Sequence, residues 1–172
     1  MGALRPYLQL MRPANVVTAV ADVLAGSSIA MAVMGDGSST SWAVLLLLSL
    51  STIGLYGGGV VFNDVFDADL DAIERPERPI PSGRVSRRNA AWFAATLFAI
   101  GVGMAMLVHV TAGGLSMAIV ASCLIYDKWA KHHGFFGPIV MGLCRGLNLL
   151  LGVSYAVPAV PERWLLAFVP VL

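Results

Sequence analysis

An aspartate-rich segment is the part of this sequence with the clearest capacity for chemistry. Four of the eight residues from Asp64 to Asp71 are aspartates, and the segment follows a long apolar run. Carboxylates this close together repel one another, so at the end of an apolar segment they need water or cations to compensate them. The segment predicts a cation site. A solvated acidic loop, neutralised by the five arginines between 75 and 88, is the alternative.

The spacing of the aspartates favours a metal ion. If the preceding helix continues through the segment at roughly 100° per residue, Asp64, Asp67 and Asp71 fall within about 60° of one another, and Asp69 lies opposite. Hard oxygen ligands of this kind suit magnesium, Mg2+, which commonly completes its shell with water and substrate phosphate oxygens. The segment contains neither Cys nor His, which disfavours zinc.

The composition places this segment in a membrane protein. Of the 172 residues, 58% are hydrophobic and 12% are charged, and the mean hydropathy is +0.78, far above that of a soluble domain. Nearly uncharged stretches of about the ~20 residues that cross a bilayer lie at about 13–34, 42–62, 90–110, 112–126 and 137–157. A sixth begins near Trp164 and stops after about nine residues, so the chain is expected to end inside a helix.

The predicted fold is therefore an all-α, polytopic transmembrane helix bundle in the cell inner membrane. Positive residues precede the first stretch and follow the second and fourth, whereas 35–41 and 109–114 have none. By the positive-inside rule, the N-terminus, the aspartate-rich loop and the loop at 127–136 face the cytoplasm. Glycines four residues apart, Gly54 with Gly58 and Gly142 with Gly146, predict close helix packing.

Polar residues inside the apolar stretches predict a cavity. Asn15, Thr18 and Asp22 share one face of the first helix, and Asp22 lies near the middle of the membrane. An ionisable residue at that depth needs a partner or a wet cavity. Arg145 and Asn148 share a face of the fifth helix, and two interpretations of Arg145 stay open. It either forms a structural ion pair with Asp22 or helps bind an anionic group.

These motifs together resemble the UbiA superfamily of intramembrane prenyltransferases. Residues 63–71 read as the NDxxDxxxD motif of that family, in its expected place after the second helix. The runs at 12–15, 75–84 and 126–131 are also similar to the family, and the resemblance extends from about residue 5 to 172. The run Arg145-Gly146-Leu147-Asn148 looks most similar to the EboC-type branch, and the archaeal-type enzymes that prenylate glycerol phosphate lipids are a close alternative.

The resemblance implies a fold and an activity. Members of the family have about nine transmembrane helices around a cavity, so residues 1–172 are expected to be a C-terminally truncated UbiA-like transmembrane domain, with five full helices and part of a sixth. A second aspartate-rich motif would follow beyond this sequence. The implied enzyme is a Mg2+-dependent transferase that moves a polyprenyl group from its diphosphate to a small acceptor. That acceptor is an aromatic compound, a polyol or a glycerol phosphate lipid, and nucleic acid is not expected as a partner.

The resemblance also implies roles for individual residues. Asp64, Asp67 and Asp71 are expected to hold Mg2+ and to be catalytic. The expected substrate-binding residues are Asn15, Asp22, Asn63, Arg78, Lys131, Arg145 and Asn148. Lys131 has an equally simple interpretation as a lysine that sets topology. Two other classes stay open, namely a carrier or channel, and a catalytically silent relative that binds or transports a precursor.

Overall fold

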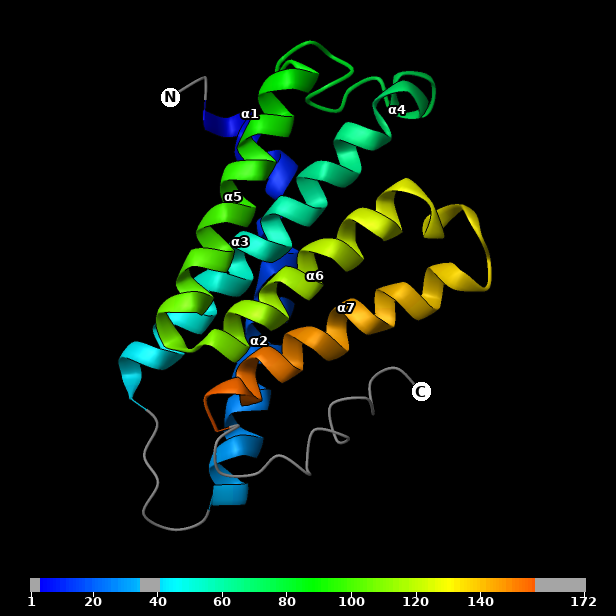
Figure 1. The fold of residues 1–172 in the computed structure, drawn as a ribbon. Coiled ribbons are helices and arrows are strands. Elements are labelled where there is room, and N and C mark those ends of the chain that lie inside the picture. Colours follow the sequence, from blue (N-terminus) through cyan, green and yellow to red (C-terminus); the bar gives the residue numbers. More distant parts are fainter. Residues whose placement is uncertain (1–3, 35–40, 157–172) are drawn as a thin grey trace.

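The computed structural model describes residues 4–34 and 41–156, and within them every regular element is helical (Figure 1). The elements are α1 (Leu4–Met11), α2 (Pro13–Met34), α3 (Trp42–Phe66), α4 (Ala68–Glu74), α5 (Arg87–Val108), α6 (Val110–Lys128), η1 (Ala130–His132), α7 (Phe136–Val153) and η2 (Ser154–Ala156). The predicted all-α fold is confirmed for this part of the chain.

Five of these helices, α2, α3, α5, α6 and α7, are long and apolar enough to cross a membrane. They confirm the five predicted stretches, with shifts at their ends. Helix α3 continues to Phe66, into the aspartate-rich motif, and α7 ends at Val153. The predicted sixth helix near Trp164 lies outside the described residues.

Helix boundaries are set by residues that suit them. The side chains of Ser41, Ser86 and His109 accept hydrogen bonds from backbone N–H groups at the starts of α3, α5 and α6, which would otherwise lack partners. Helix α2 begins at Pro13, because proline fits the first helical position and disfavours helical geometry in the residue before it. That residue, Arg12, has a φ of 49° and makes a corner between α1 and α2.

Glycines allow α3 and α5 to pack backbone against backbone. A Cβ atom on Gly54 would lie 2.7 Å from the carbonyl oxygen of Leu97, and one on Gly101 would lie 2.9 Å from that of Ser51. A Cβ atom on Gly58 would meet the ring of Phe98 at 2.6 Å. The close packing predicted at Gly54 and Gly58 is therefore confirmed, and its partner is α5.

A second glycine contact joins α2 to α7, although the two helices lie far apart in the sequence. A Cβ atom on Gly26 would collide with the carbonyl oxygen of Leu149, and one on Gly152 would collide with that of Val23. Ser27 Oγ also donates a hydrogen bond of 3.0 Å to the carbonyl oxygen of Gly152. Figure 1 shows α7 crossing α2 at this end of the bundle.

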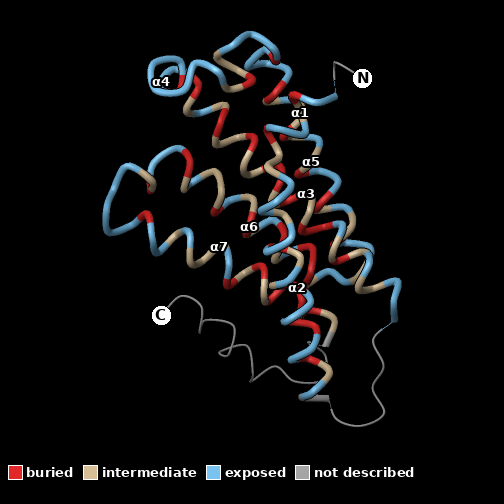
Figure 2. The backbone as a smooth tube through the Cα atoms, turned by 180° about the vertical axis from the view of Figure 1, so that it is seen from behind, coloured by how far each residue is buried: buried red, intermediate tan, exposed pale blue. Residues whose placement is uncertain are grey.

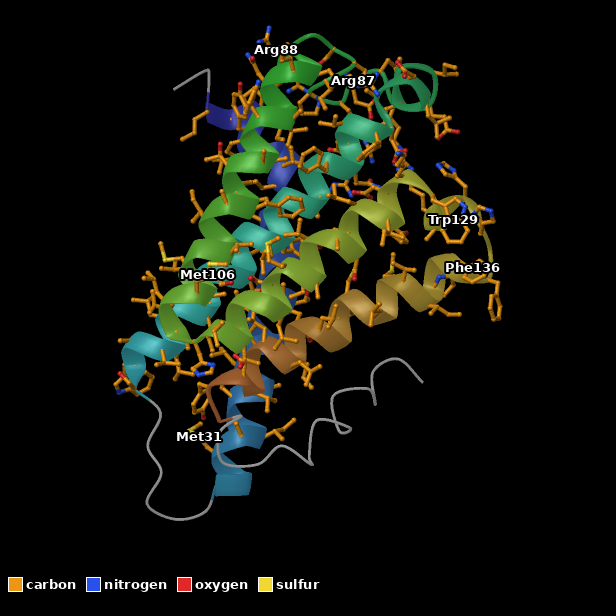
Figure 3. The ribbon with its side chains drawn as sticks, viewed as in Figure 1. Met31, Arg87, Arg88, Met106, Trp129 and Phe136 are labelled. Atoms are coloured by element: carbon orange, nitrogen blue, oxygen red, sulfur yellow. The ribbon has the colours of Figure 1, made fainter. Side chains whose placement is uncertain are left out.

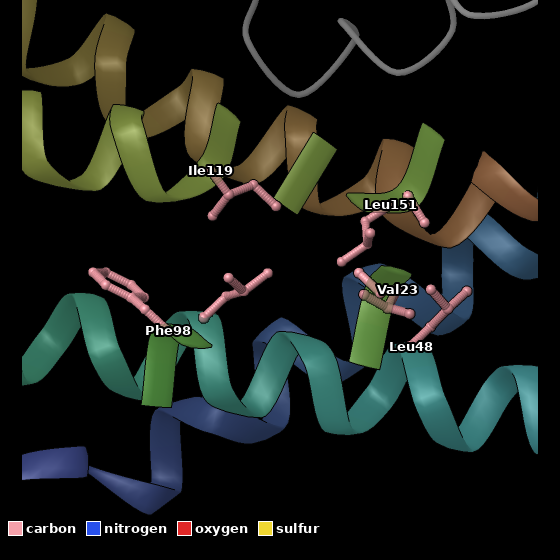
Figure 4. Packing of buried hydrophobic residues seen from close by; sticks show 8 residues of the cluster. Val23, Leu48, Phe98, Ile119 and Leu151 are labelled. Carbon is pink, nitrogen blue, oxygen red and sulfur yellow. The ribbon is translucent and has the colours of Figure 1, made fainter. Parts of the chain in front are cut away.

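The apolar core lies between the long helices. Val23, Leu48, Phe98, Ile119 and Leu151 are buried there and come from all five spans (Figure 4). Figure 2 shows that the outward faces of the long helices carry exposed residues, and many of those are large and apolar. Such an apolar exterior is suited to lipid.

Candidate functional site

A cavity of about 490 Å³ lies between α2, α3, α6 and α7. Polar and charged side chains line it together with apolar ones. Five of the seven predicted substrate-binding residues line it, namely Asn15, Asp22, Asn63, Arg145 and Asn148. The predicted polar cavity therefore exists, and the two remaining residues, Arg78 and Lys131, lie beside it on the aspartate-rich side.

The aspartate-rich segment is helical except for a break at Asp67. Helix α3 ends at Phe66, the backbone N–H of Asp67 donates to the carbonyl oxygen of Asn63, and α4 begins at Ala68. One residue outside helical geometry leaves the register almost intact, so Asp64 and Asp71 lie on the same, buried side. The side chain of Asp69 is 89% exposed and pairs with Arg87 at 3.1 Å.

Asp64 and Asp71 converge on one cation. Arg78 Nη1 lies 2.6 Å from Asp71 Oδ2 and 3.4 Å from Asp64 Oδ1, and Arg12 Nη2 lies 2.5 Å from the same Asp64 oxygen. Partial burial of Arg78 disfavours its charge, but the hydrogen bond to Asp71 and the nearby carboxylates outweigh burial and raise the pKa of Arg78. The position of Arg78 Nη1 is therefore one at which two carboxylates together stabilise a positive charge.

Asp67 binds a different cation. Lys131 Nζ lies 2.6 Å from Asp67 Oδ1, and this ion pair joins the end of α3 to η1. Among residues 4–34 and 41–156, no three potential metal ligands are grouped closely enough to hold one ion. The structure thus brings Asp64 and Asp71 together as expected, whereas Asp67 is drawn toward Lys131.

The donors in this segment nevertheless fit Mg2+. The carboxylates of Asp64 and Asp71 already bond to the same nitrogen atom of Arg78, and carboxylate oxygens are the preferred protein ligands of Mg2+. A site with one or two protein carboxylates is also typical for this ion, because substrate phosphate oxygens and water fill the other positions.

Asp127 is a candidate residue that sequence reasoning did not single out. It lies one residue from the end of α6, lines the cavity and is only 3% exposed. Asn63 Nδ2 donates to its Oδ1 at 2.9 Å, whereas its Oδ2 has no hydrogen-bond partner among the described residues. The signal in the sequence was an acid at the end of an apolar stretch, on the same predicted membrane face as the aspartate-rich segment.

Asp22 and Arg145 form an ion pair across the cavity wall. Arg145 Nη2 lies 3.0 Å from Asp22 Oδ1 and 3.1 Å from Oδ2, so the structural ion-pair interpretation holds. The Arg145 side chain is still 58% exposed, which leaves its other nitrogen atoms accessible from the cavity. The pair can therefore both join α2 to α7 and present positive charge to a bound group.

Asn148 acts within the protein. Its Oδ1 accepts a hydrogen bond of 2.7 Å from Thr52 Oγ1, and its Nδ2 donates one of 2.8 Å to the carbonyl oxygen of Ala19. These bonds tie α7 to α3 and α2 and use both polar atoms of the amide. Asn148 therefore shapes the cavity wall, whereas Asn15 is exposed on that wall.

Figure 3 shows two surface features around this site. Arg87 lies close to the α4 loop, where it pairs with Asp69, and Arg88 lies at the same end of α5. Trp129 and Phe136 lie beside each other at the turn between α6 and α7, with ring centroids 5.1 Å apart. Basic and aromatic residues at helix ends are typical of the interface between a membrane and water.

The structure combines a bundle of membrane helices, an internal cavity with polar residues and a charged loop beside it. These features define the class of proteins that act on or carry molecules within the bilayer. The family model of the UbiA prenyltransferase family matches residues 23–172. The chain belongs to that family, and the resemblance seen in its motifs is confirmed.

The curated relatives most similar in sequence include two archaeal proteins. The digeranylgeranylglyceryl phosphate synthase of Methanopyrus kandleri is 37% identical over 164 residues, which cover 94% of this chain and 57% of the relative. The protein of the same name from Saccharolobus solfataricus is 32% identical over 97% of this chain and 56% of the relative. The chain thus spans somewhat more than half the length of these relatives. Their name corresponds to the archaeal-type alternative rather than to the EboC-type branch.

Solved structures share the fold. A structure described as giving insight into digeranylgeranylglyceryl phosphate synthase in membranes has a TM-score of 0.81 and 26% identity, covering 91% of this chain and 57% of the other. A UbiA homologue from Archaeoglobus fulgidus, bound to DMAPP and Mg2+, also has a TM-score of 0.81, with 18% identity over 94% of this chain and 58% of the other. The helices described here therefore have the arrangement of that fold.

Proposed function

We propose that this chain is part of a Mg2+-dependent intramembrane prenyltransferase, which moves a polyprenyl group from its diphosphate to a small acceptor. The proposal rests on one observation. Asp64 and Asp71 bond to the same nitrogen atom of Arg78, next to an intramembrane cavity. The relatives named digeranylgeranylglyceryl phosphate synthase and the homologue bound to DMAPP and Mg2+ support it.

The aspartates and the basic side chains paired with them would have different roles in binding the prenyl diphosphate donor. Asp64, Asp67 and Asp71 would hold Mg2+. When bound, this ion would neutralise the charge on the diphosphate leaving group. Arg12, Arg78 and Lys131 already stand among these carboxylates. They can turn toward diphosphate oxygens once the carboxylates have another cation, since guanidinium and ammonium groups bind phosphate well.

The rest of the cavity would hold the prenyl chain. Leu55, Val60, Ile119 and Met141 contribute apolar wall between the charged groups. Breaking the C–O bond to the diphosphate leaves an allylic cation, which water would capture. An apolar wall that excludes water therefore favours transfer to the intended acceptor.

The acceptor that fits best is a glycerol phosphate lipid. Arg145 and Arg12 line the cavity and can attract an anionic headgroup, and an acceptor that is itself a lipid can enter from the bilayer. The names of the archaeal relatives support the same class. An aromatic acceptor or a neutral polyol would make less use of these arginines.

The enzymatic proposal is tested with the full-length protein in membranes and a radiolabelled polyprenyl diphosphate. Asp64→Asn and Asp71→Asn are expected to lower transfer at least about 100-fold, because each removes a charge at the point where a cation is held. Chelation with EDTA is expected to do the same, and Mg2+ to restore activity. Asp69→Asn is the matched control, since Asp69 is exposed, and equal losses from all three variants would contradict the site.

One observation favours a second candidate, a silent relative that binds or transports a precursor. Each of Asp64, Asp67 and Asp71 already has a cationic side chain as a partner, so the segment is neutralised by the protein itself. Binding of a labelled prenyl diphosphate that resists EDTA, with no transfer to any acceptor, would support this function instead.

The orientation is also a proposal, in which the inner membrane holds the bundle with the aspartate-rich loop in the cytoplasm. Ser82 lies in that loop, and His109 lies at the opposite ends of the spans, between α5 and α6. With Cys123 and Cys144 replaced by alanine, Ser82→Cys should react with an impermeant maleimide only from the cytoplasmic side. His109→Cys should react only from the other side, and the reverse pattern would overturn the orientation.

A further inference from the structure

The carboxyl group of Asp127 is an unused polar group inside the cavity wall. The residue is 3% exposed and its Oδ2 has no partner among the described residues. Leaving a buried carboxylate oxygen without a hydrogen bond destabilises a protein, so native structures rarely contain one. Such an atom beside a cavity indicates that something bound there completes its hydrogen bonding.

The surroundings of Asp127 place it beside the donor site but outside the cluster of carboxylates. Asn63, which holds its Oδ1, directly precedes Asp64 in α3. Lys131, about one helical turn farther along the chain, is paired with Asp67. Lys131 is therefore engaged by Asp67, and Asn63 fixes one oxygen of Asp127 while the other has no hydrogen-bond partner among the described residues.

We propose that Asp127 binds the hydroxyl group of the acceptor and takes its proton during transfer, so that the acceptor is an alcohol. This inference rests on the proposed prenyltransferase function and deepens it. A carboxylate has about four acceptor sites on its two oxygens, so Asp127, with one site used by the Asn63 amide, can still accept a hydrogen bond at its unpaired Oδ2. A hydroxyl group is the simplest donor that also carries a nucleophilic oxygen.

The step balances in atoms and charge. The bond between C1 of the prenyl group and the diphosphate oxygen breaks, and its electron pair leaves with the diphosphate. A lone pair of the acceptor oxygen forms the new C–O bond to C1, which gives an ether. The hydroxyl proton passes to Asp127 Oδ2, and the carboxyl group later releases it to water. General base assistance of this kind typically contributes about 10²–10⁴-fold to a rate.

The sharpest variant is Asp127→Asn, because an amide has nearly the shape of the carboxyl group that it replaces. The amide oxygen can still accept from Asn63, but the amide nitrogen can neither accept from a hydroxyl group nor take a proton. Transfer to an alcohol is expected to fall about 100-fold or more. Mg2+-dependent release of diphosphate without acceptor, with water as the trap, is expected to fall by a smaller factor than transfer does, because breaking the C–O bond of the donor does not need the base. Asp69→Asn serves as the control in both assays.

A purely structural role predicts a different pattern. If Asp127 only holds helices together, Asp127→Asn should lower the melting temperature and reduce both rates alike. If Asp127 is the base, the melting temperature of Asp127→Asn should be unchanged or higher, because the substitution removes an unsatisfied buried charge. Loss of diphosphate release together with transfer, or transfer at the wild-type rate, would overturn it.

A binding measurement separates this inference from the proposed function. The probes are a glycerol phosphate lipid with one free hydroxyl group and its deoxy analogue, and the readout is the shift in melting temperature of the full-length protein. The wild type should be stabilised more by the alcohol, and Asp127→Ala equally by both, since a site built to hydrogen-bond a hydroxyl group discriminates against its absence and alanine has no group that can bond to it. Equal stabilisation of the wild type by both lipids counts against Asp127. A wild type that transfers no prenyl group to any acceptor counts against the proposed function.

Discussion

Two faces of α3 have opposite roles. One packs closely against a neighbouring helix, and the other lines the cavity. One face carries Ser51, Gly54 and Gly58 and is closed against α5. The other carries Thr52, Gly59 and Asn63 and lines the cavity. Both stripes follow helical spacing, so each stays on its own side for the length of the span.

The difference between the faces shows how an apolar bundle keeps a polar interior open. On the closed face, backbones approach so closely that no side chain larger than hydrogen fits at Gly54. On the open face, side-chain hydrogen bonds such as that from Thr52 to Asn148 span the gap between helices. Close packing on one side thus holds α3 in place while the other side presents functional groups.

The largest effect on stability is expected on the closed face, from Gly54→Ala. Its new methyl group would lie 2.7 Å from the carbonyl oxygen of Leu97, and backbone cannot move aside easily. Overpacking of this kind typically costs about 1–3 kcal/mol of unfolding free energy. Thermal unfolding in detergent, followed by size-exclusion chromatography, measures it.

The matched control for Gly54 is Gly103→Ala on α5, where no atom lies within 4 Å of the added Cβ. This change should leave stability unchanged or raise it by up to about 1 kcal/mol, because alanine is the better helix former. Equal losses from the two variants would mean that α3 and α5 do not pack as described.

An intermediate effect is expected on the open face, from Thr52→Val. The change keeps the shape of the side chain but removes the hydrogen bond to the buried Asn148 Oδ1. The free energy of unfolding should fall by about 1–2 kcal/mol, the usual consequence of leaving one buried acceptor unpaired. Thr96→Val is the control, since its hydroxyl group bonds to its own exposed helix, and an equal loss there would show that Thr52 has no special role.

The smallest effect on stability is expected from Gly59→Ala, also on the open face. The added Cβ would meet Cys123 Sγ at 3.2 Å, a side-chain atom beside the cavity that can shift. Stability should change by no more than about 0.5 kcal/mol, measured by the same thermal unfolding. Any loss of transferase activity from the narrower cavity should be restored by the second change Cys123→Ala. A loss of stability as large as that of Gly54→Ala would remove the distinction between the two faces.

Much of this architecture follows from the sequence because the bilayer imposes simple rules. Span length and hydropathy predicted all five long helices, and helical spacing predicted that Asp69 would face away from Asp64 and Asp71. Gly54 and Gly58 predicted close packing for the same reason, since only small residues allow it. These features depend on local composition and periodicity alone.

The features that the sequence did not predict depend on contacts between distant residues. Arg12 was interpreted as a marker of topology and as part of the 12–15 run that resembles the family, but its bond to Asp64, 52 residues away, was not predicted. Asp67 was expected to share one cation with Asp64 and Asp71, but its ion pair is with Lys131, 64 residues away. Asp127 lies in the 126–131 run that resembles the family, but the sequence assigned it no role, because its burial and its missing hydrogen-bond partner are visible only after folding.

The corner at Arg12 couples two properties of the molecule that are usually treated separately. A residue other than glycine in the left-handed region costs about 1–3 kcal/mol, so contacts must hold it there. One of those contacts is the ion pair with Asp64, and α1 on the far side of the corner is fixed to α5 by the edge-to-face contact of Tyr7 with Phe93. Any group that displaces the guanidinium from Asp64 therefore also loosens the corner. By reciprocity, a chain in which that corner is already relaxed binds such a group more tightly. The direction of α1 and the binding of another group at Asp64 are therefore coupled, and each shifts the other.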